Sequence, residues 1–222
     1  MAASANNGKH ENMILAALAL AAASPISGPA PKPLILAFGD SLTAGHNLAS
    51  GLGFAPQLQA TLRRHGIGAS VVDGGVSGDT TTGGKARLGW TLAGLKRTPD
   101  LVILELGAND MLRTIDPAIT HANLDAIMTE LDRRHIPVLV AGMKAAPNLD
   151  PAYRTKFDAI FPDLAAKHRA PRYDFFLDGV AAVPAMQQAD GLHPTFAGIK
   201  RIVTGILPRV TTALARNGNA RN

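Results

Sequence analysis

The sequence predicts an α/β protein: a flavodoxin-like three-layer α/β/α sandwich with a five-stranded parallel sheet. The chain has 222 residues and is 46% hydrophobic, which is enough for one compact domain and too little for two. From residue 34 onward, short apolar runs alternate with longer segments of helical period. Strands that alternate with helices pair in parallel through right-handed crossovers, so helices are expected on both faces of the sheet.

The expected strands are the short apolar runs at 34–38, 69–73, 101–106, 138–142 and 173–177. The expected helices are the longer segments at 54–65, 81–96, 117–135, 151–168 and 194–215. In the second helix, Trp90 and the leucines around it fit a buried face, so we expect them in the core. The loop at 143–152 either covers a bound acyl chain or simply connects two elements.

The charge of the chain does not favour nucleic-acid binding, although the net charge is +5. The basic clusters at 63–65, 96–97, 133–135 and 167–169 each fall at the end of an expected helix, where cations offset the helix dipole. Binding of single-stranded nucleic acid requires aromatic residues among the basic ones, and none interleaves with these clusters. The chain has no cysteine and no HExxH pattern, so thiolate chemistry is excluded and no metal is expected.

Residues 1–33 differ in composition from the rest of the chain. The apolar run at 13–23 is shorter than the roughly 20 residues that span a bilayer, and it suits the hydrophobic region of a signal peptide. A Pro-rich linker follows at 24–33. We therefore expect a periplasmic or secreted protein with a leader at 1–33; the alternative is a retained N-terminal helix in a cytoplasmic protein. A flexible tail is expected at 217–222.

Candidate functional residues follow the expected strands. In an open parallel sheet, ligands bind beyond the carboxyl ends of the strands. Small and polar residues stand at these ends and before the last helix, in four segments: Gly39-Asp40-Ser41, 74–80, Gly107-Ala108-Asn109-Asp110 and Asp190-Gly191-Leu192-His193-Pro194. The topology therefore brings reactive groups from four segments to one edge of the sheet.

Ser41 stands where the first strand turns directly into an expected helix. A serine hydroxyl is a poor nucleophile until a base takes its proton, and that base needs a third group to orient it. Asp190 and His193 are three residues apart and so face the same side of a turn. The sequence predicts a catalytic triad of these three residues, with Pro194 beginning the final helix. Taken alone, Ser41 would more simply be a helix N-cap.

Acyl transfer also needs hydrogen-bond donors for the oxyanion. The candidates are the backbone N–H groups of Ser41 and Gly78 and the side-chain amide of Asn109. We expect Ser41 at a helix N-terminus, where the local field favours negative charge, and glycine at 78 lets the backbone approach the substrate. Because the triad already has its acid, three further carboxylates are expected only to support the strand ends: Asp40, Asp79 and Asp110.

Together the segments GDSL (39–42), SGDT (77–80), GAND (107–110) and DGLHP (190–194) resemble the four blocks of the SGNH hydrolases, also called GDSL lipases and esterases. The loop at 142–149 is similar to that of the bacterial arylesterase, thioesterase and lysophospholipase branch. The resemblance implies a hydrolase domain at 34–216 of flavodoxin-like fold, and it implies these roles: Ser41 as nucleophile, His193 as base, Asp190 as its orienter, and Gly78 and Asn109 as oxyanion donors. Residues Gly74-Gly75 stand where relatives commonly have Asn-Ala. This difference bears on the shape of the acyl pocket and not on the chemistry.

The predicted function is a serine esterase that hydrolyses small acyl or aryl esters, or thioesters or lysophospholipids, through an acyl-enzyme on Ser41, with no cofactor. One alternative is a carbohydrate O-acetylesterase. Another is a non-enzymatic phosphate- or nucleotide-binding module, since residues 78–85 resemble a phosphate loop. In that loop, however, an extra glycine at 84 displaces Lys85, and Ala86 replaces the required hydroxyl.

Overall fold

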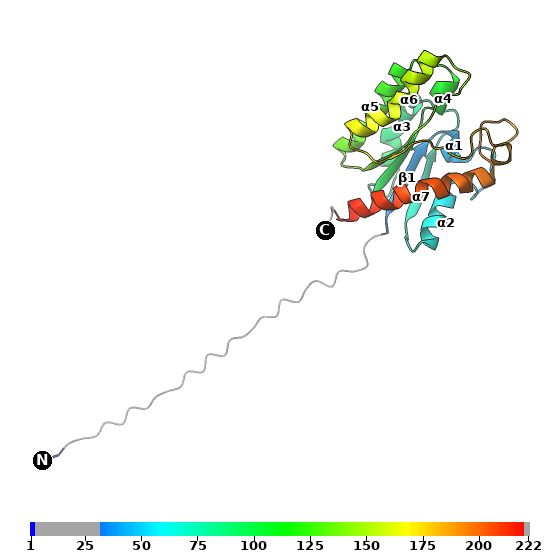
Figure 1. Ribbon diagram of the computed structural model, residues 1–222. Helices are drawn as coiled ribbons and strands as arrows, with labels where there is room; N and C mark the ends of the chain where they lie inside the picture. Colours follow the sequence, from blue (N-terminus) through cyan, green and yellow to red (C-terminus); the bar gives the residue numbers. More distant parts are fainter. Residues whose placement is uncertain (3–31, 220–222) are drawn as a thin grey trace. The chain divides into compact units, whose positions relative to one another are not determined.

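A parallel sheet of five strands forms the centre of the computed structural model, which describes residues 1–2 and 32–219 (Figure 1). The strand order is β2-β1-β3-β4-β5. The strands are β1 (Leu34–Gly39), β2 (Ser70–Gly75), β3 (Leu101–Glu105), β4 (Val138–Ala141) and β5 (Arg172–Tyr173). In register, Gly39 at the end of β1 lies opposite Gly75 of β2 and Glu105 of β3, so three strands end together.

Helices cover both faces of this sheet. The long ones are α2 (Phe54–Arg64), α3 (Thr81–Ala93), α5 (Pro117–Arg133), α6 (Pro151–Lys167) and α7 (Phe196–Asn219). The helix α2 packs with α7 on one face, while α3, α5 and α6 pack side by side on the other (Figure 1). The remaining elements are short: α1 (Ser41–Ala44), α4 (Ala108–Leu112) and η1 (Pro184–Met186). The predicted fold class, including the five parallel strands, is confirmed.

The core lies on both sides of the central strands. All of β3 is buried, as is β1 apart from Leu34. These near-continuous apolar runs are typical of parallel strands covered on both faces. On the α2 side, the ring of Phe54 meets that of Phe176 edge-on at 5.1 Å, and both side chains are fully buried. The buried core therefore extends to the ends of β1 and β3.

Two packing expectations were wrong. Trp90 is 87% exposed, whereas Leu88 and Leu92 on the same helix are buried, so the apolar face of α3 excludes the indole. The fifth strand stops at Tyr173 instead of continuing to residue 177. Beyond it the chain leaves the sheet, because the N–H of Phe176 donates to the carbonyl of Gly142, and the Phe176 ring then turns into the core.

Three helix ends also differ from expectation. The last helix begins at Phe196 and not at Pro194, because the Thr195 hydroxyl accepts from the N–H of Gly198 and Pro194 pairs with Gln187 in an isolated bridge. The helix α3 ends at Ala93, so the cluster at 96–97 lies beyond it, and Arg97 pairs with Asp100 at 2.8 Å. At the chain end, α7 continues to Asn219, into the segment expected as a tail.

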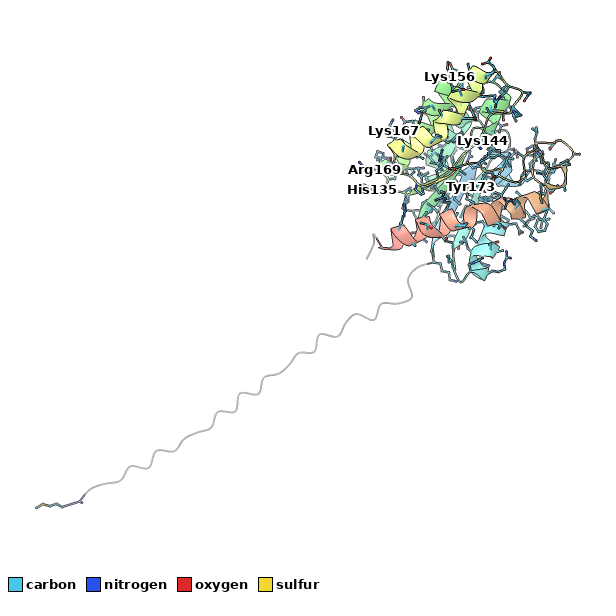
Figure 2. The ribbon with its side chains drawn as sticks, in the orientation of Figure 1. His135, Lys144, Lys156, Lys167, Arg169 and Tyr173 are labelled. Atoms are coloured by element: carbon cyan, nitrogen blue, oxygen red, sulfur yellow. The ribbon has the colours of Figure 1, made fainter. Side chains whose placement is uncertain are left out.

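The basic clusters at 63–65, 133–135 and 167–169 do stand at helix ends, with Lys167 in the last turn of α6 (Figure 2). The expected leader and linker fall almost wholly outside the described residues. Within residues 32–219, no helix is both long enough and apolar enough to cross a membrane.

Candidate active site

The turn that carries Ser41 is built by the residues around it. Ser41 is the first residue of α1, directly after β1, and it is 8% exposed. The buried carboxylate of Asp40 caps the turn by accepting from the N–H of Leu42 at 3.0 Å. A side chain at Gly39 would collide with the Thr43 hydroxyl and with Glu105, so only glycine allows this tight exit from the strand. Because α1 is a single turn, its dipole contributes less at Ser41 than that of a longer helix would.

The predicted triad residues lie in hydrogen-bonding contact. His193 Nε2 is 2.9 Å from Ser41 Oγ, and His193 Nδ1 is 2.7 Å from Asp190 Oδ2. The other oxygen of Asp190 accepts from the backbone N–H groups of His193 and Leu192 at 3.0 and 2.9 Å. The hydrogen bonds from His193 and then from Leu192 lower the pKa of Asp190 below its usual range. An ionised Asp190 accepts the Nδ1 proton, which leaves Nε2 free to accept from the serine hydroxyl.

Two of the predicted oxyanion donors follow β2 and β3, the two strands that flank β1. Asn109, in the first turn of α4, donates from Nδ2 to the Asp79 carbonyl at 2.9 Å and to Asp40 Oδ2 at 3.1 Å. Both amide hydrogens are therefore engaged, so an oxyanion would share one of them. Gly78 has a left-handed backbone with φ of +84°, which is the reason for glycine at this position. Its carbonyl accepts from the guanidinium of Arg113 at 2.9 Å.

The carboxylates of Asp40 and Asp79 fix strand ends. Asp40 is fully buried, and burial raises its pKa to about 6 against the lowering effect of the Leu42 and Asn109 hydrogen bonds. Asp79 pairs with Arg87 at 2.5 Å, and the same guanidinium donates to the Gly39 carbonyl at 2.8 Å. Arg87 therefore ties the second of the four motif segments to the end of β1.

Asp110 acts away from the nucleophile. Its carboxylate accepts from the Thr81 N–H at 2.8 Å, from the Thr81 hydroxyl at 2.5 Å and from the Thr120 hydroxyl at 3.1 Å. Asp110, in α4, thus links the start of α3 to the first turns of α5. Lys85, the cation of the phosphate-loop resemblance, lies 2.5 Å from Asn123 Oδ1, so it is engaged with α5.

Sequence reasoning missed Glu105, which ends β3 and is fully buried. Its Oε2 accepts from the Thr43 hydroxyl at 2.8 Å and from the Asp40 N–H at 3.4 Å, while Oε1 has no partner among the described residues. Burial, and then the charge of Asp40, raises the pKa of Glu105 well above its usual range. A glutamate at the end of the apolar run LVILE was the signal that sequence analysis could have used.

A cavity of about 590 Å³ opens beside Ser41 and His193. Its walls are mainly apolar and come from α4, from the loop after β4 and from the segment before α7, including Met111, Leu112, Met143, Leu177, Ala181 and Leu192. Residues 143–147 form part of the wall, with Lys144 in that loop (Figure 2). Met143 is 3% exposed and borders the cavity. No cluster of metal-ligating side chains occurs among the residues that the structure describes.

Comparison with known proteins identifies the family to which this chain belongs. The model of the GDSL-like lipase/acylhydrolase family matches residues 37–201, about three quarters of the chain. The chain belongs to this family. Esterase TesA of Pseudomonas aeruginosa is 37% identical to this GDSL hydrolase over 180 residues, covering 81% of this chain and 89% of TesA. The arylesterase of Vibrio mimicus is 36% identical over 160 residues, covering 72% and 79% of the two chains.

Solved structures agree with this placement of the GDSL hydrolase. AlinE4, described as an SGNH-hydrolase family esterase, has a TM-score of 0.71 at 44% identity, over 84% of this chain and 99% of its own. A crystal structure of TesA has a TM-score of 0.76 at 36% identity, over 81% and 99%. The family predicted from the four blocks is confirmed.

Proposed function

We propose that this GDSL hydrolase works through an acyl-enzyme formed on Ser41. The protein is a carboxylic ester hydrolase of the GDSL family. The observation that carries the proposal is the continuous hydrogen-bonded chain from Ser41 Oγ through His193 to Asp190, with distances of 2.9 and 2.7 Å. Such a chain activates a hydroxyl that is otherwise a weak nucleophile.

The reaction follows from these contacts. His193 takes the proton of Ser41 as Oγ attacks the ester carbonyl carbon, and the negative charge moves to the carbonyl oxygen. The N–H groups of Ser41 and Gly78 and the amide of Asn109 stabilise that oxyanion. When the intermediate collapses, His193 gives its proton to the leaving oxygen. Water then repeats the cycle on the acyl-enzyme, while Asp190 stays ionised and stabilises the imidazolium.

The apolar cavity supports an acyl chain as the part of the substrate bound beside Ser41. Its volume of about 590 Å³ lies in the range of ordinary ligand pockets. We propose small acyl and aryl esters as substrates, with thioesters and lysophospholipids as further classes. A relative in Escherichia coli, 32% identical over 160 residues, bears the name thioesterase 1/protease 1/lysophospholipase L1. The apolar walls do not favour a sugar, so carbohydrate deacetylation ranks lower.

Hydrolysis of p-nitrophenyl esters from acetate to palmitate tests the proposal, with Ser41→Ala beside the native protein and Ser70→Ala, an exposed serine of β2, as the control. We expect turnover that peaks at one chain length, disappears in Ser41→Ala and is unchanged in Ser70→Ala. A fluorophosphonate should label the native protein and Ser70→Ala alone. Equal labelling or turnover in Ser41→Ala would exclude Ser41 as the nucleophile.

We also propose that the protein is exported to the periplasm or secreted. The support is the sequence of residues 1–33, in which an eleven-residue apolar run precedes small residues and a Pro-rich segment. Fractionation of a Gram-negative host, followed by N-terminal sequencing of the exported form, checks this proposal. Full-length protein confined to the cytoplasm would contradict it.

A further inference from the structure

His46 lies against the predicted catalytic base. It follows Ser41 by five residues, and its ring centroid is 4.4 Å from that of His193, with the ring planes tilted by 39°. Its backbone N–H donates to the Ser41 carbonyl at 3.1 Å, which fixes it to the turn of the nucleophile. His46 is half-buried and is not among the residues that line the acyl cavity. It therefore contacts the base without facing the substrate.

Gln188 joins the two segments that carry these histidines. Its side-chain amide donates to the His46 carbonyl at 2.8 Å and to the Pro194 carbonyl at 2.9 Å. Its backbone N–H donates to the His193 carbonyl at 2.7 Å. Gln188 thus connects the loop after α1 to the carbonyls of His193 and Pro194, although His46 and Gln188 are 142 residues apart in sequence.

His193 needs such a support because its segment lies outside the sheet. The side chain of Asp190 is 36% exposed, whereas that of His193 is 18% exposed, so neighbouring groups from other loops cover most of the imidazole, and His46 is one of them. The bond to Asp190 holds one ring nitrogen and leaves the imidazole free to swing about that contact. A ring packed on the imidazole face restricts this motion and keeps Nε2 directed at Ser41. A loss of alignment at a reacting group of even about 1 Å can lower the rate 100-fold.

We infer that His46 is a positioning residue that holds the His193 ring in line with Ser41, and that Gln188 fixes the backbone on which both rings stand. The inference rests on the proposed role of Ser41. It predicts that any flat ring of similar size at position 46 supports catalysis, whereas a small side chain does not.

The test compares native protein, His46→Ala, His46→Phe and a control, His65→Phe, with p-nitrophenyl acetate. His65 is an exposed residue at the end of α2. We expect kcat of His46→Ala to fall about 10- to 100-fold with KM changed less than about twofold. We expect His46→Phe to recover to within about threefold of the native kcat, and His65→Phe to be unchanged.

The opposite outcomes are equally definite. A kcat of His46→Ala equal to that of the native protein, or an equal loss of kcat in the Ala and Phe variants, overturns the positioning role. Activity that survives Ser41→Ala, or none in the native protein, overturns the proposed function instead. A crystal structure of His46→Ala then still decides: His193 displaced from Ser41 supports the positioning role, and His193 in hydrogen-bond contact with Ser41 refutes it.

Discussion

Replacement of Glu105 by Gln should remove a pH dependence of stability that comes from one buried carboxyl. Glu105 is fully buried, and burial raises its pKa well above the usual range. Glutamine has nearly the same shape, and its amide oxygen can accept the bonds from the Thr43 hydroxyl and the Asp40 N–H that Oε2 now accepts. The substitution therefore changes the titration with little change in packing.

The sign follows from proton binding in the two states. Above about pH 4.3 the unfolded Glu105 is ionised, whereas the folded one keeps its proton until the pH passes its raised pKa. The folded state then binds one proton more, so the native protein loses about 1.4 kcal/mol of stability per pH unit through this group. Glu105→Gln lacks that loss. Its stability relative to the native protein should therefore rise with pH, by up to about 1.4 kcal/mol per unit, until the pH passes the raised pKa of Glu105.

Urea unfolding at several pH values between 5 and 8 measures this difference, since other titrating groups largely cancel between the two proteins. Glu130→Gln is the matched control. Glu130 is a partly exposed residue of α5 whose pKa the hydrogen bonds from Arg133 and then Arg134 lower to about 2, so it is ionised in both states throughout this range. Its difference from the native protein should be flat. A flat difference for Glu105→Gln as well would refute the argument for a neutral buried carboxyl.

Five further substitutions have defined outcomes. Asp190→Asn should lower kcat by about 10²- to 10⁴-fold in steady-state ester hydrolysis, because the amide no longer fixes the imidazole tautomer; a loss below tenfold would contradict the triad. His135→Gly and Arg169→Gly (Figure 2) should each stabilise the fold by about 0.5–1 kcal/mol in urea unfolding, because both residues have left-handed backbones, with φ of 56° and 52°. Phe176→Ala should cost about 3–5 kcal/mol by the same method, since the ring is fully buried; a cost under 1 kcal/mol would contradict the assigned core. Ala181→Phe, in the cavity wall, should shift the preferred p-nitrophenyl ester to a shorter acyl chain, and an unchanged preference would place the chain elsewhere.

The elements of this fold were predictable because their signals are local. The apolar runs that became β1 and β3 are buried on both faces, and the helices have the expected period. What failed depends on partners distant in sequence. Trp90 has the composition of a core residue, yet its exposure is decided by which side of α3 meets the sheet. The early end of β5 depends on the packing of Phe176 against Phe54, which lies 122 residues earlier in the chain.

The candidate site likewise contains residues that the sequence predicted and residues that only the structure reveals. Ser41, Asn109, Asp190 and His193 were found because each lies in a short motif next to a strand or helix end. Glu105 carries no motif, and its importance comes from burial, which a sequence does not display. Contacts such as that of His46 with His193 join segments far apart in the chain, so only coordinates reveal them.

The catalytic edge combines a part held by the sheet with a part held by contacts between loops. In the first part, Asp40 accepts from Asn109, Asn109 donates to the carbonyl of Asp79, and Asp79 pairs with Arg87, which donates back to the carbonyl of Gly39. This closed set of bonds joins the ends of β1, β2 and β3, so Ser41 and the proposed oxyanion donors keep their spacing without any contribution from the loop that carries His193.

The base stands outside that set, on the exposed segment before α7. Its link to the nucleophile, apart from the hydrogen bond to Ser41 itself, runs through His46 and Gln188. Damage to the first part should therefore reduce oxyanion stabilisation and stability together. Damage at His46 should reduce kcat while the free energy of unfolding changes little, and measuring both quantities on one set of variants separates the two parts.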